Sequence, residues 1–266
     1  MMQTFYWDCP SAEAREGHWW EAIQEMVPDL ALDGFTSLWL PPASKGANWN
    51  SMGYDPYDYY DLGEFDQKGR KETWYGSRDK LGELIKAAHA SHLAVYADVV
   101  INHNSGADAQ EVNPLTHDMR WTKFTPKSGK FPRDWKCFHP SCYETMDGFP
   151  TFGDMPDLCH RAPAVYVGLM DFTRWLIEEI GFDGFRFDFV KGYGSWIVKG
   201  IAEYRYAGQG APFCVGECWD SDRVIDEPFP GSGLTPVCTK ASTGFAPRAA
   251  RYSSCVGDRP DPWGAP

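Results

Sequence analysis

The feature that most constrains this chain is a regular alternation of short apolar runs with helical patterns. Strand-like runs occupy residues 3–7, 37–40, 94–100, 184–189 and 213–217. The first two begin 34 residues apart and the last two begin 29 residues apart, close to the ~30 residues of one βαβ unit. We therefore predict a parallel sheet whose strands are connected by helices.

Helical patterns fall between these runs. In residues 78–90, Leu81, Leu84, Ile85 and Ala88 lie close to the i, i+3, i+4, i+7 stripe of an amphipathic helix. The predicted helices are residues 18–30, 78–90, 162–180 and 195–206. Gly181 is expected to end the third.

The residues at the strand ends decide between two parallel architectures. Repeated βα units are compatible with a (β/α)₈ barrel or a doubly wound sheet. No predicted strand end carries the GxGxxG of a dinucleotide-binding turn, but three carry acidic residues: Asp98, Asp188 and Glu217. Acidic side chains at the C-terminal ends of several strands are typical of a barrel active site, so we predict a TIM-barrel fold.

Two connections are longer than one βαβ unit. The second and third strands begin 57 residues apart, with the surplus in a Gly-, Tyr- and Asp-rich loop at 41–77. The third and fourth begin 90 residues apart, and residues 103–160 are rich in Pro, Asp, Cys and His. We predict a small irregular domain inserted after the third strand.

The strand at 184–189 has two different faces. Phe185, Phe187 and Phe189 alternate with Arg186 and Asp188, and side chains alternate sides along a strand. We expect the phenylalanines to face the helices and the charged pair to face the barrel mouth. A cation next to a carboxyl group favours its ionised form, so Asp188 is expected to have a low pKa, as a nucleophile requires.

Glu217 ends the next strand in the company of Val215 and Trp219. An apolar setting raises the pKa of a carboxyl group, which suits a general acid. Two carboxyl groups with these different roles are what hydrolysis of a glycosidic bond commonly uses. The alternative is a buried structural ion pair near an unrelated glutamate.

Five segments, in register with the predicted strand ends and the insert, resemble one family. They are GYDPYDYYDLGEF (53–65), DVVINH (98–103), MPDLCH (155–160), GFRFDFVKGY (184–193) and VGECWD (215–220). They are similar to signature segments of the α-amylase family of retaining glycoside hydrolases. The resemblance covers about residues 3–226 and implies a substrate of α-glucan polysaccharide or oligosaccharide.

The resemblance also implies site residues. Asp188 matches the nucleophile and Glu217 the acid/base. Asp98 is expected to buttress the site through Arg186. His103 and Tyr54 match residues that hold the sugar at the cleavage point, and Lys191 and Tyr193 match contacts on the leaving-group side. The expected substrate-binding group is therefore Tyr54, His103, Arg186, Lys191 and Tyr193.

A calcium ion is expected where the insert meets the barrel. Oxygen ligands, including backbone carbonyls, suit Ca²⁺, and in the resembled family calcium ties the inserted domain to the barrel. The matching ligands are Asn102, Asp147, Asp157 and the carbonyl of Gly192, with Asp134 and Asp154 as competitors for the place of Asp147. Solvated loop acids and an Asn cap are the alternative.

A second metal is conceivable in the insert. The segment CFHPSC (137–142) contains His139 and Cys142, and the pair Cys159 and His160 follows it. His139, Cys142 and Cys159 have a spacing that can make a zinc site. A disulfide or free thiols fit the same residues. By contrast, Cys9, Cys214 and Cys218 lie beside apolar segments and are expected to pack as small hydrophobic residues.

Charge and hydropathy exclude some partners. The formal net charge of −12 and a pI near 5.0 argue against nucleic acid and anionic membranes. No apolar run approaches the ~20 residues of a membrane span. The first residues, MMQTFYWD, have no basic segment or apolar core of a signal peptide, although relatives are often secreted, so the compartment is left open.

The last segment differs in composition. Residues 227–266 contain seven Pro and five Gly, which favours disorder. The family's His-Asp signature after its seventh strand and its C-terminal β-domain have no counterpart. We expect an incomplete barrel of about five βα units, divided as 1–102, insert 103–160, 161–226 and an aberrant tail 227–266.

Three functions are compatible with these observations. The first is an α-amylase that hydrolyses internal α-1,4-glucosidic bonds of starch or glycogen by a retaining double displacement, weakly active or inactive as this chain. A maltooligosaccharide-forming or transglycosylating member of the same family would share the motifs. The third is a non-catalytic, amylase-like carbohydrate-binding protein. The oligomeric state is left open.

Overall fold

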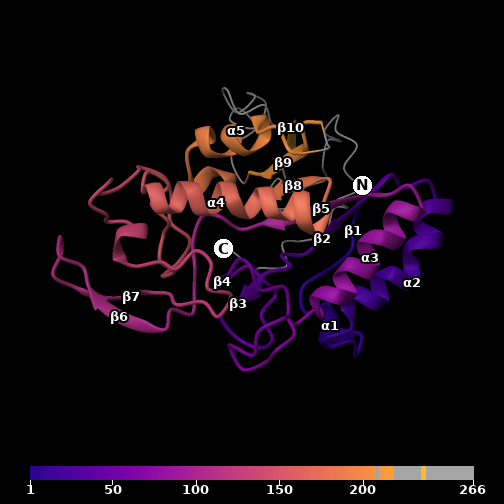
Figure 1. The fold of residues 1–266 in the computed structure, drawn as a ribbon, viewed down its shortest axis with the longest axis horizontal. Coiled ribbons are helices and arrows are strands. Elements are labelled where there is room, and N and C mark those ends of the chain that lie inside the picture. The colour runs from indigo at the N-terminus through magenta and orange to yellow at the C-terminus, as the bar shows by residue number, and fades with distance from the viewer. Residues whose placement is uncertain (208–209, 219–234, 238–266) are drawn as a thin grey trace, which may run out of the picture.

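A six-stranded sheet lies at the centre of the molecule (Figure 1). The computed structural model describes residues 1–207, 210–218 and 235–237. The strand order in the sheet is β1-β2-β5-β8-β9-β10. These strands are β1 (Met2–Gln3), β2 (Ser37–Leu40), β5 (Ala94–Val99), β8 (Gly184–Phe187), β9 (Phe213–Glu217) and β10 (Thr235–Val237).

The order of the strands in space is the same as their order in the sequence. Every neighbouring pair is parallel. A doubly wound sheet reverses its strand order at a switch point, and this sheet does not. The fold is therefore the predicted incomplete TIM barrel, and the described residues add a sixth strand, β10, to the five that were expected.

Helices connect the parallel strands. Figure 1 shows α2 and α3 side by side, with α4 running along the sheet and α5 beyond it. The helices are α1 (Cys9–Ala12), α2 (Trp19–Leu32), α3 (Arg78–Ala90), α4 (Pro163–Trp175), the π-helical turn η2 (Leu176–Ile180), α5 (Ser195–Glu203) and the 3₁₀ turns η1 (Trp135–Cys137) and η3 (Val190–Gly192).

Local signals explain where these helices begin and end. The Ser77 hydroxyl accepts from the backbone N–H of Lys80 and caps α3. Gly181 has a left-handed backbone, φ 97°, directly after η2, a conformation that glycine adopts without steric cost. Predicted and observed bounds agree for α3. The long predicted helix 162–180 is α4 continued by the π-helical turn.

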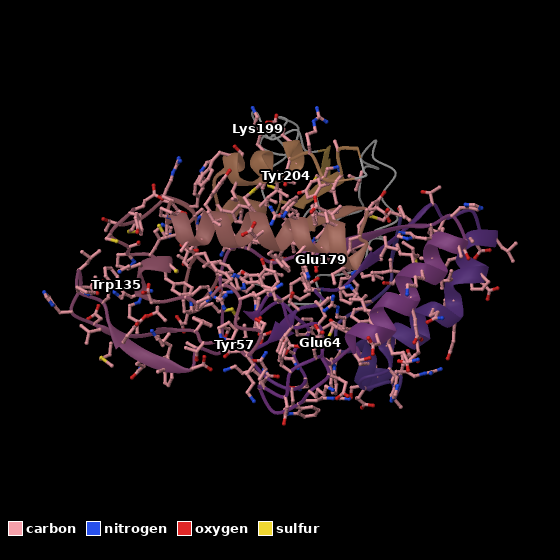
Figure 2. The ribbon with its side chains drawn as sticks, viewed as in Figure 1. Tyr57, Glu64, Trp135, Glu179, Lys199 and Tyr204 are labelled. Atoms are coloured by element: carbon pink, nitrogen blue, oxygen red, sulfur yellow. The ribbon has the colours of Figure 1, made fainter. Side chains whose placement is uncertain are left out.

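The core lies between the sheet and its helices. Phe185 and Phe187 of β8 are fully buried, as are Ile23 of α2 and Leu84 of α3. Figure 2 shows side chains filling the centre of the molecule, with Lys199 of α5 at its outer edge. The predicted alternation is thus confirmed for Phe185 and Phe187, which are core residues, whereas Phe189 lies outside β8 and is only partly buried.

The long loop after β2 is organised around a buried cation. It contains the antiparallel pair β3 (Lys45–Gly46) and β4 (Pro56–Asp58). The Lys45 ammonium donates to the carbonyls of Arg70 at 3.0 Å and Glu72 at 3.1 Å and lies 3.5 Å from Asp61. Because a buried charge needs such partners, this lysine fixes the path of residues 61–77.

The insert leaves the sheet after β5 and returns before α4. It begins with the antiparallel hairpin β6 (Ala109–Val112) and β7 (Met119–Lys123). Figure 1 shows this hairpin at the end of the molecule opposite α2 and α3. The returning chain pairs with the segment that left the sheet, since Leu158 N donates to Asn102 O at 2.9 Å. The two ends of the insert are thereby held beside the end of β5.

Three strands are shorter than predicted, and β5 differs only by ending at Val99 rather than residue 100. β1 ends at Gln3 rather than residue 7, and β8 ends at Phe187 because Phe189 takes a left-handed backbone, φ 46°. Of the tail 227–266, the described residues are Thr235–Val237, which form β10 against β9; the rest lies outside the described residues. Among the helices of the described chain, none is long and apolar enough to cross a bilayer.

Candidate active site

One guanidinium gathers three carboxyl groups at the C-terminal ends of β5, β8 and β9. Arg186 Nη1 lies 2.8 Å from Asp98 Oδ1 and 2.8 Å from Asp188 Oδ1, and Nη2 lies 2.9 Å from Glu217 Oε1. Adjacent parallel strands place their carboxyl ends at one edge of the sheet. The structure therefore brings the two predicted catalytic acids to the same cation.

Asp98 is a buttress, as predicted. It is buried and accepts from both Arg186 and two aromatic side chains. The Tyr54 hydroxyl donates to Asp98 Oδ2 at 2.8 Å, and Trp39 Nε1 donates to the same oxygen at 3.1 Å. Sequence reasoning missed Trp39, although its place near the end of β2 was the available signal.

The balance of charge at Asp188 differs from the prediction. Burial raises the pKa of Asp188 well above its ordinary value; Arg186 lowers it, while the charges of Glu217 and Asp98 and a hydrogen bond with Glu217 raise it further. The expected low pKa was wrong because three carboxyl groups share one guanidinium. Burial and the neighbouring carboxyl groups therefore favour a protonated form of the Asp188–Glu217 pair.

Both carboxylate oxygens of Glu217 have partners. Oε1 lies on Arg186, and Oε2 accepts from the backbone N–H of Phe189 at 3.3 Å. That N–H is available because Phe189 has left β8 in a left-handed conformation. Trp219, expected as an apolar neighbour of Glu217, lies outside the described residues.

Tyr54 and His103 lie together beside this cluster. His103 Nε2 is 2.9 Å from the Tyr54 carbonyl, and burial lowers the pKa of the imidazole, which keeps it neutral. The Phe152 ring stacks on His103 with ring centroids 4.9 Å apart. His103 is thus covered from the insert by Phe152, which sequence reasoning did not identify.

The two residues predicted to contact the leaving group, Lys191 and Tyr193, differ in their burial. Tyr193 is fully buried, and its hydroxyl donates to the backbone carbonyl of Asp188 at 2.8 Å. It therefore holds the nucleophile segment in place, and its contact with the substrate stays a prediction. Lys191 is partly exposed in η3.

Buried oxygens at the insert junction fit a calcium ion. Asn102 Oδ1 and Asp157 Oδ1 are buried and have no hydrogen-bond partner among the described residues, a costly arrangement unless a cation satisfies them. A Cβ on Gly192 would lie 2.1 Å from Asn102 Oδ1, so only glycine leaves this oxygen space. The residues present fit the metal that the resemblance implied.

Geometry separates the three candidates for a further ligand. An oxygen of Asp147 lies within 4.8 Å of one of Asp157 in a group that also contains His139. Asp134 instead accepts from Lys136 N at 3.0 Å and caps η1, and Asp154 is exposed. Of the three, Asp147 is the one brought to the junction.

The predicted zinc ligands are not all brought together. Cys142 is exposed and belongs to none of the clusters of potential metal ligands in the described chain. His139 and Cys159 do lie together, but with Glu144. His160 Nε2 is engaged by the Ile101 carbonyl at 2.8 Å.

The described cysteines form no disulfide with one another. Cys9, Cys214 and Cys218 are buried, which confirms that they pack as small hydrophobic residues. Burial raises the pKa of Cys9 and that of Cys214, each to about 12. Thiols of this kind are unreactive at neutral pH.

Comparison with known proteins agrees with the site. The family model for the catalytic domain of α-amylase matches residues 17–206. This chain belongs to the α-amylase family. The match includes β5 with Asp98, β8 with Arg186, and Asp188 directly after β8, so three of the four residues of the charged cluster lie inside it.

Curated relatives come from several bacteria. The chain is 33% identical to an α-amylase of Geobacillus stearothermophilus, covering 84% of this chain and 48% of that protein. It is 32% identical to a glucan 1,4-α-maltohexaosidase of Bacillus sp. strain 707, covering 84% and 51%. The chain thus spans about half the length of these family members.

Solved structures of the family share the fold. An α-amylase from Geobacillus thermoleovorans, complexed with acarbose, superposes with a TM-score of 0.59 at 24% identity, covering 82% of this chain and 44% of that one. A cyclomaltodextrin glucanotransferase, CldA, superposes with a TM-score of 0.60 at 22% identity, covering 81% and 46%. These similarities support the incomplete barrel.

Proposed function

We propose that this chain acts on α-glucans by retaining hydrolysis of internal α-1,4-glucosidic bonds. The observation that carries the proposal is the contact of one guanidinium with both Asp188 and Glu217. A retaining glycosidase needs two carboxyl groups close enough for one to attack the sugar while the other protonates the leaving oxygen. The names of the α-amylase and maltohexaosidase relatives support the substrate class.

The first step uses the shared proton. Glu217 donates it to the glycosidic oxygen as the bond to the anomeric carbon breaks, and the Asp188 carboxylate forms a bond to that carbon. The positive charge that develops on the sugar favours the ionised form of Asp188. As the glycosidic bond breaks, this charge therefore favours the proton on the side of Glu217 and the leaving oxygen and leaves Asp188 as the nucleophile.

The second step returns the enzyme to its initial state. Glu217, now ionised, removes a proton from water, which attacks the anomeric carbon and breaks the bond to Asp188. Arg186 remains paired with Asp98 in both steps, so its charge stays in place. Tyr54 and His103 are proposed to contact the sugar, which requires Phe152 to move off the His103 ring.

Calcium is proposed as a structural ion. Asn102, Asp157, Asp147 and the carbonyl of Gly192 would hold it at the junction between the insert and the end of β5. There it would neutralise the acidic side chains and fix the start of the insert relative to the nucleophile segment. Asn102 directly precedes His103, so the ion would also fix the imidazole.

Turnover by the isolated chain is proposed to be low. A closed barrel has eight strands, whereas the sheet of the described residues has six and ends in β1 and β10. The maltohexaosidase relative supports the maltooligosaccharide-forming alternative. The lengths of the oligosaccharides released would distinguish it from random endo-cleavage. A protein that only binds carbohydrate would form no covalent intermediate, so detection of that intermediate distinguishes the two functions.

The decisive experiment traps the covalent glycosyl–enzyme intermediate, so that it does not depend on a high rate of turnover. The chain is incubated with an activated, fluorinated α-glucosyl fluoride, and its peptides are analysed by mass spectrometry. We expect one glycosyl adduct on the peptide that contains residue 188 in the wild type and none in Asp188→Asn. In a separate assay, Glu217→Gln is expected to slow the release of reducing ends from soluble starch. Starch binding without any adduct would favour the carbohydrate-binding function instead.

A further inference from the structure

The insert contains a second cluster of potential metal ligands that the proposed reaction does not use. His139, Glu144 and Cys159 each place one ligand atom within 4.8 Å of the others. His139 and Cys159 are buried, and Glu144 is partly exposed. The cluster lies in the insert next to η1, the turn that contains Trp135 (Figure 2), since Cys159 N donates to the carbonyl of Cys137 in that turn at 2.8 Å.

The two ring nitrogens of His139 face different groups. Nδ1 is 2.9 Å from Asp157 Oδ2, whereas Nε2 is 3.6 Å from Glu144 Oε2. Nε2 is buried and has no hydrogen-bond partner among the described residues, on a side chain that is only 6% exposed. An unpartnered buried nitrogen aimed at a carboxylate and a sulfur is the arrangement of a metal ligand.

We propose that His139 Nε2, Cys159 Sγ and Glu144 bind a zinc-class divalent cation. Imidazole, thiolate and carboxylate are the ligands that zinc takes in proteins, at about 2.0–2.3 Å. Tetrahedral ligands at those distances lie roughly 3.3–3.8 Å apart, and His139 Nε2 and Glu144 Oε2 lie 3.6 Å apart. A thiolate and a carboxylate neutralise the two charges of the ion.

The surroundings of the cluster complete the site. The Asp157 carboxylate holds Nδ1–H of His139, the second interaction that commonly orients a zinc-bound histidine. A cavity of about 240 Å³, lined in part by Glu144, Asp147 and Arg161, gives access from the Glu144 side. The fourth ligand would be water, and binding releases the thiol proton of Cys159.

The proposed zinc ligands differ from the calcium ligands, but His139 of the first set contacts Asp157 of the second. Asp157 offers Oδ2 to His139, while its Oδ1 is the buried oxygen without a partner that fits calcium. Soft ligands such as thiolate select zinc over calcium. The two ions would thus occupy opposite sides of one carboxylate, and the zinc proposal stands even if the chain does not cleave glucans.

Metal content tests the proposal in the full chain. The protein is stripped with a chelator, dialysed against excess calcium with a slight molar excess of zinc over protein, freed of unbound metal, and analysed for bound metal by mass spectrometry. We expect one zinc per chain with wild type and with Cys142→Ser, whose cysteine is exposed, and none with Cys159→Ser. Absence of bound zinc in the wild type overturns the proposal.

Cobalt substitution identifies the ligands directly. A thiolate-to-cobalt charge-transfer band is expected in the wild type and in Cys142→Ser, and its loss is expected in Cys159→Ser. If Cys159→Ser does not fold by circular dichroism, Glu144→Gln replaces it, with metal affinity expected to fall at least ~10-fold. A band that depends on Cys142, or an affinity unchanged by Glu144→Gln, overturns the assignment.

Discussion

At the scale of single residues, the candidate active site has more acidic groups than cationic ones. Arg186 is buried and contacts three carboxyl groups. One cation cannot neutralise three anions in a largely buried region. The site therefore stabilises a protonated carboxyl pair, which suits a general acid but opposes the folded state when all three groups are ionised.

This excess charge predicts that Asp188→Asn stabilises the fold. Because the pKa of Asp188 is raised on folding, its ionisation costs stability as pH rises from the unfolded pKa, about 3.9, through the folded pKa. The variant lacks this cost, so its Tm at pH 7 should be higher by about 2–4 °C, equivalent to roughly 1 kcal/mol. Thermal melts by circular dichroism measure the difference.

The pH dependence provides the check. Below about pH 4 both states hold the proton, so the melting temperatures of wild type and Asp188→Asn should converge. Asp171→Asn is the matched control, since Asp171 is in an exposed pair with Arg174 and should change stability by less than about 0.5 kcal/mol. A lower Tm for Asp188→Asn at pH 7 would contradict the charge argument.

At the scale of elements, the pairing of β8 with β9 places the nucleophile beside the acid. The register sets Arg186 opposite Val215, so the residues that follow each strand meet at one edge. Close approach of the strands depends on Gly184, where a Cβ would lie 2.2 Å from the Phe213 carbonyl oxygen. That backbone oxygen cannot move without disturbing the pair.

Gly184→Ala is therefore expected to destabilise the chain by about 1–3 kcal/mol, the usual cost of overpacking. Gly82→Ala is the control, because it lies inside α3 with nothing within 4 Å of its Cβ position. Alanine in an open helical position should stabilise by about 0.5–1 kcal/mol. Urea unfolding measures both, and equal effects of the two substitutions would contradict this role of Gly184.

At the scale of the whole molecule, the insert and the sheet meet at buried oxygens. Asn102 and Asp157 lie on two paired segments, since Leu158 N donates to Asn102 O and Asp157 is bridged to His103. Gly192 of η3 lies next to Asn102 Oδ1. Three segments that are distant in the sequence thus converge on one place. A cation there would link the insert, the end of β5 and the nucleophile segment.

Calcium is therefore expected to raise the Tm of the chain. An ion that binds only the folded state stabilises it by roughly 2.7 kcal/mol at a hundred times its Kd. Scanning calorimetry with calcium and with a chelator should show this gain in the wild type and in Asn50→Ala, which changes an exposed asparagine. Asn102→Ala should remove most of the gain.

A second variant keeps this prediction testable if Asn102→Ala does not fold. Gly192→Ala would push a methyl group toward Asn102 Oδ1 and should also reduce the calcium-dependent shift. A Tm of the wild type that does not respond to calcium would remove the junction site. Retention of the full shift in both variants would place the ion elsewhere.

The local sequence determined the elements of this protein and the identity of its two acids. Helical and strand periods are properties of short segments, so α3, β2 and β9 could be predicted to their ends. The placement of Asp98, Asp188 and Glu217 at strand ends followed from the parallel order of βα units. Five motifs in register with the strand ends indicate the family from the sequence alone.

Only the tertiary structure decided what surrounds these residues. The raised pKa of Asp188, the burial of Tyr193 and the stacking of Phe152 on His103 depend on segments that are far apart in the sequence. The same holds for His139, which meets Glu144 and Cys159 rather than Cys142. Charge balance and burial are sums over all neighbours in space, and a sequence lists neighbours only along the chain.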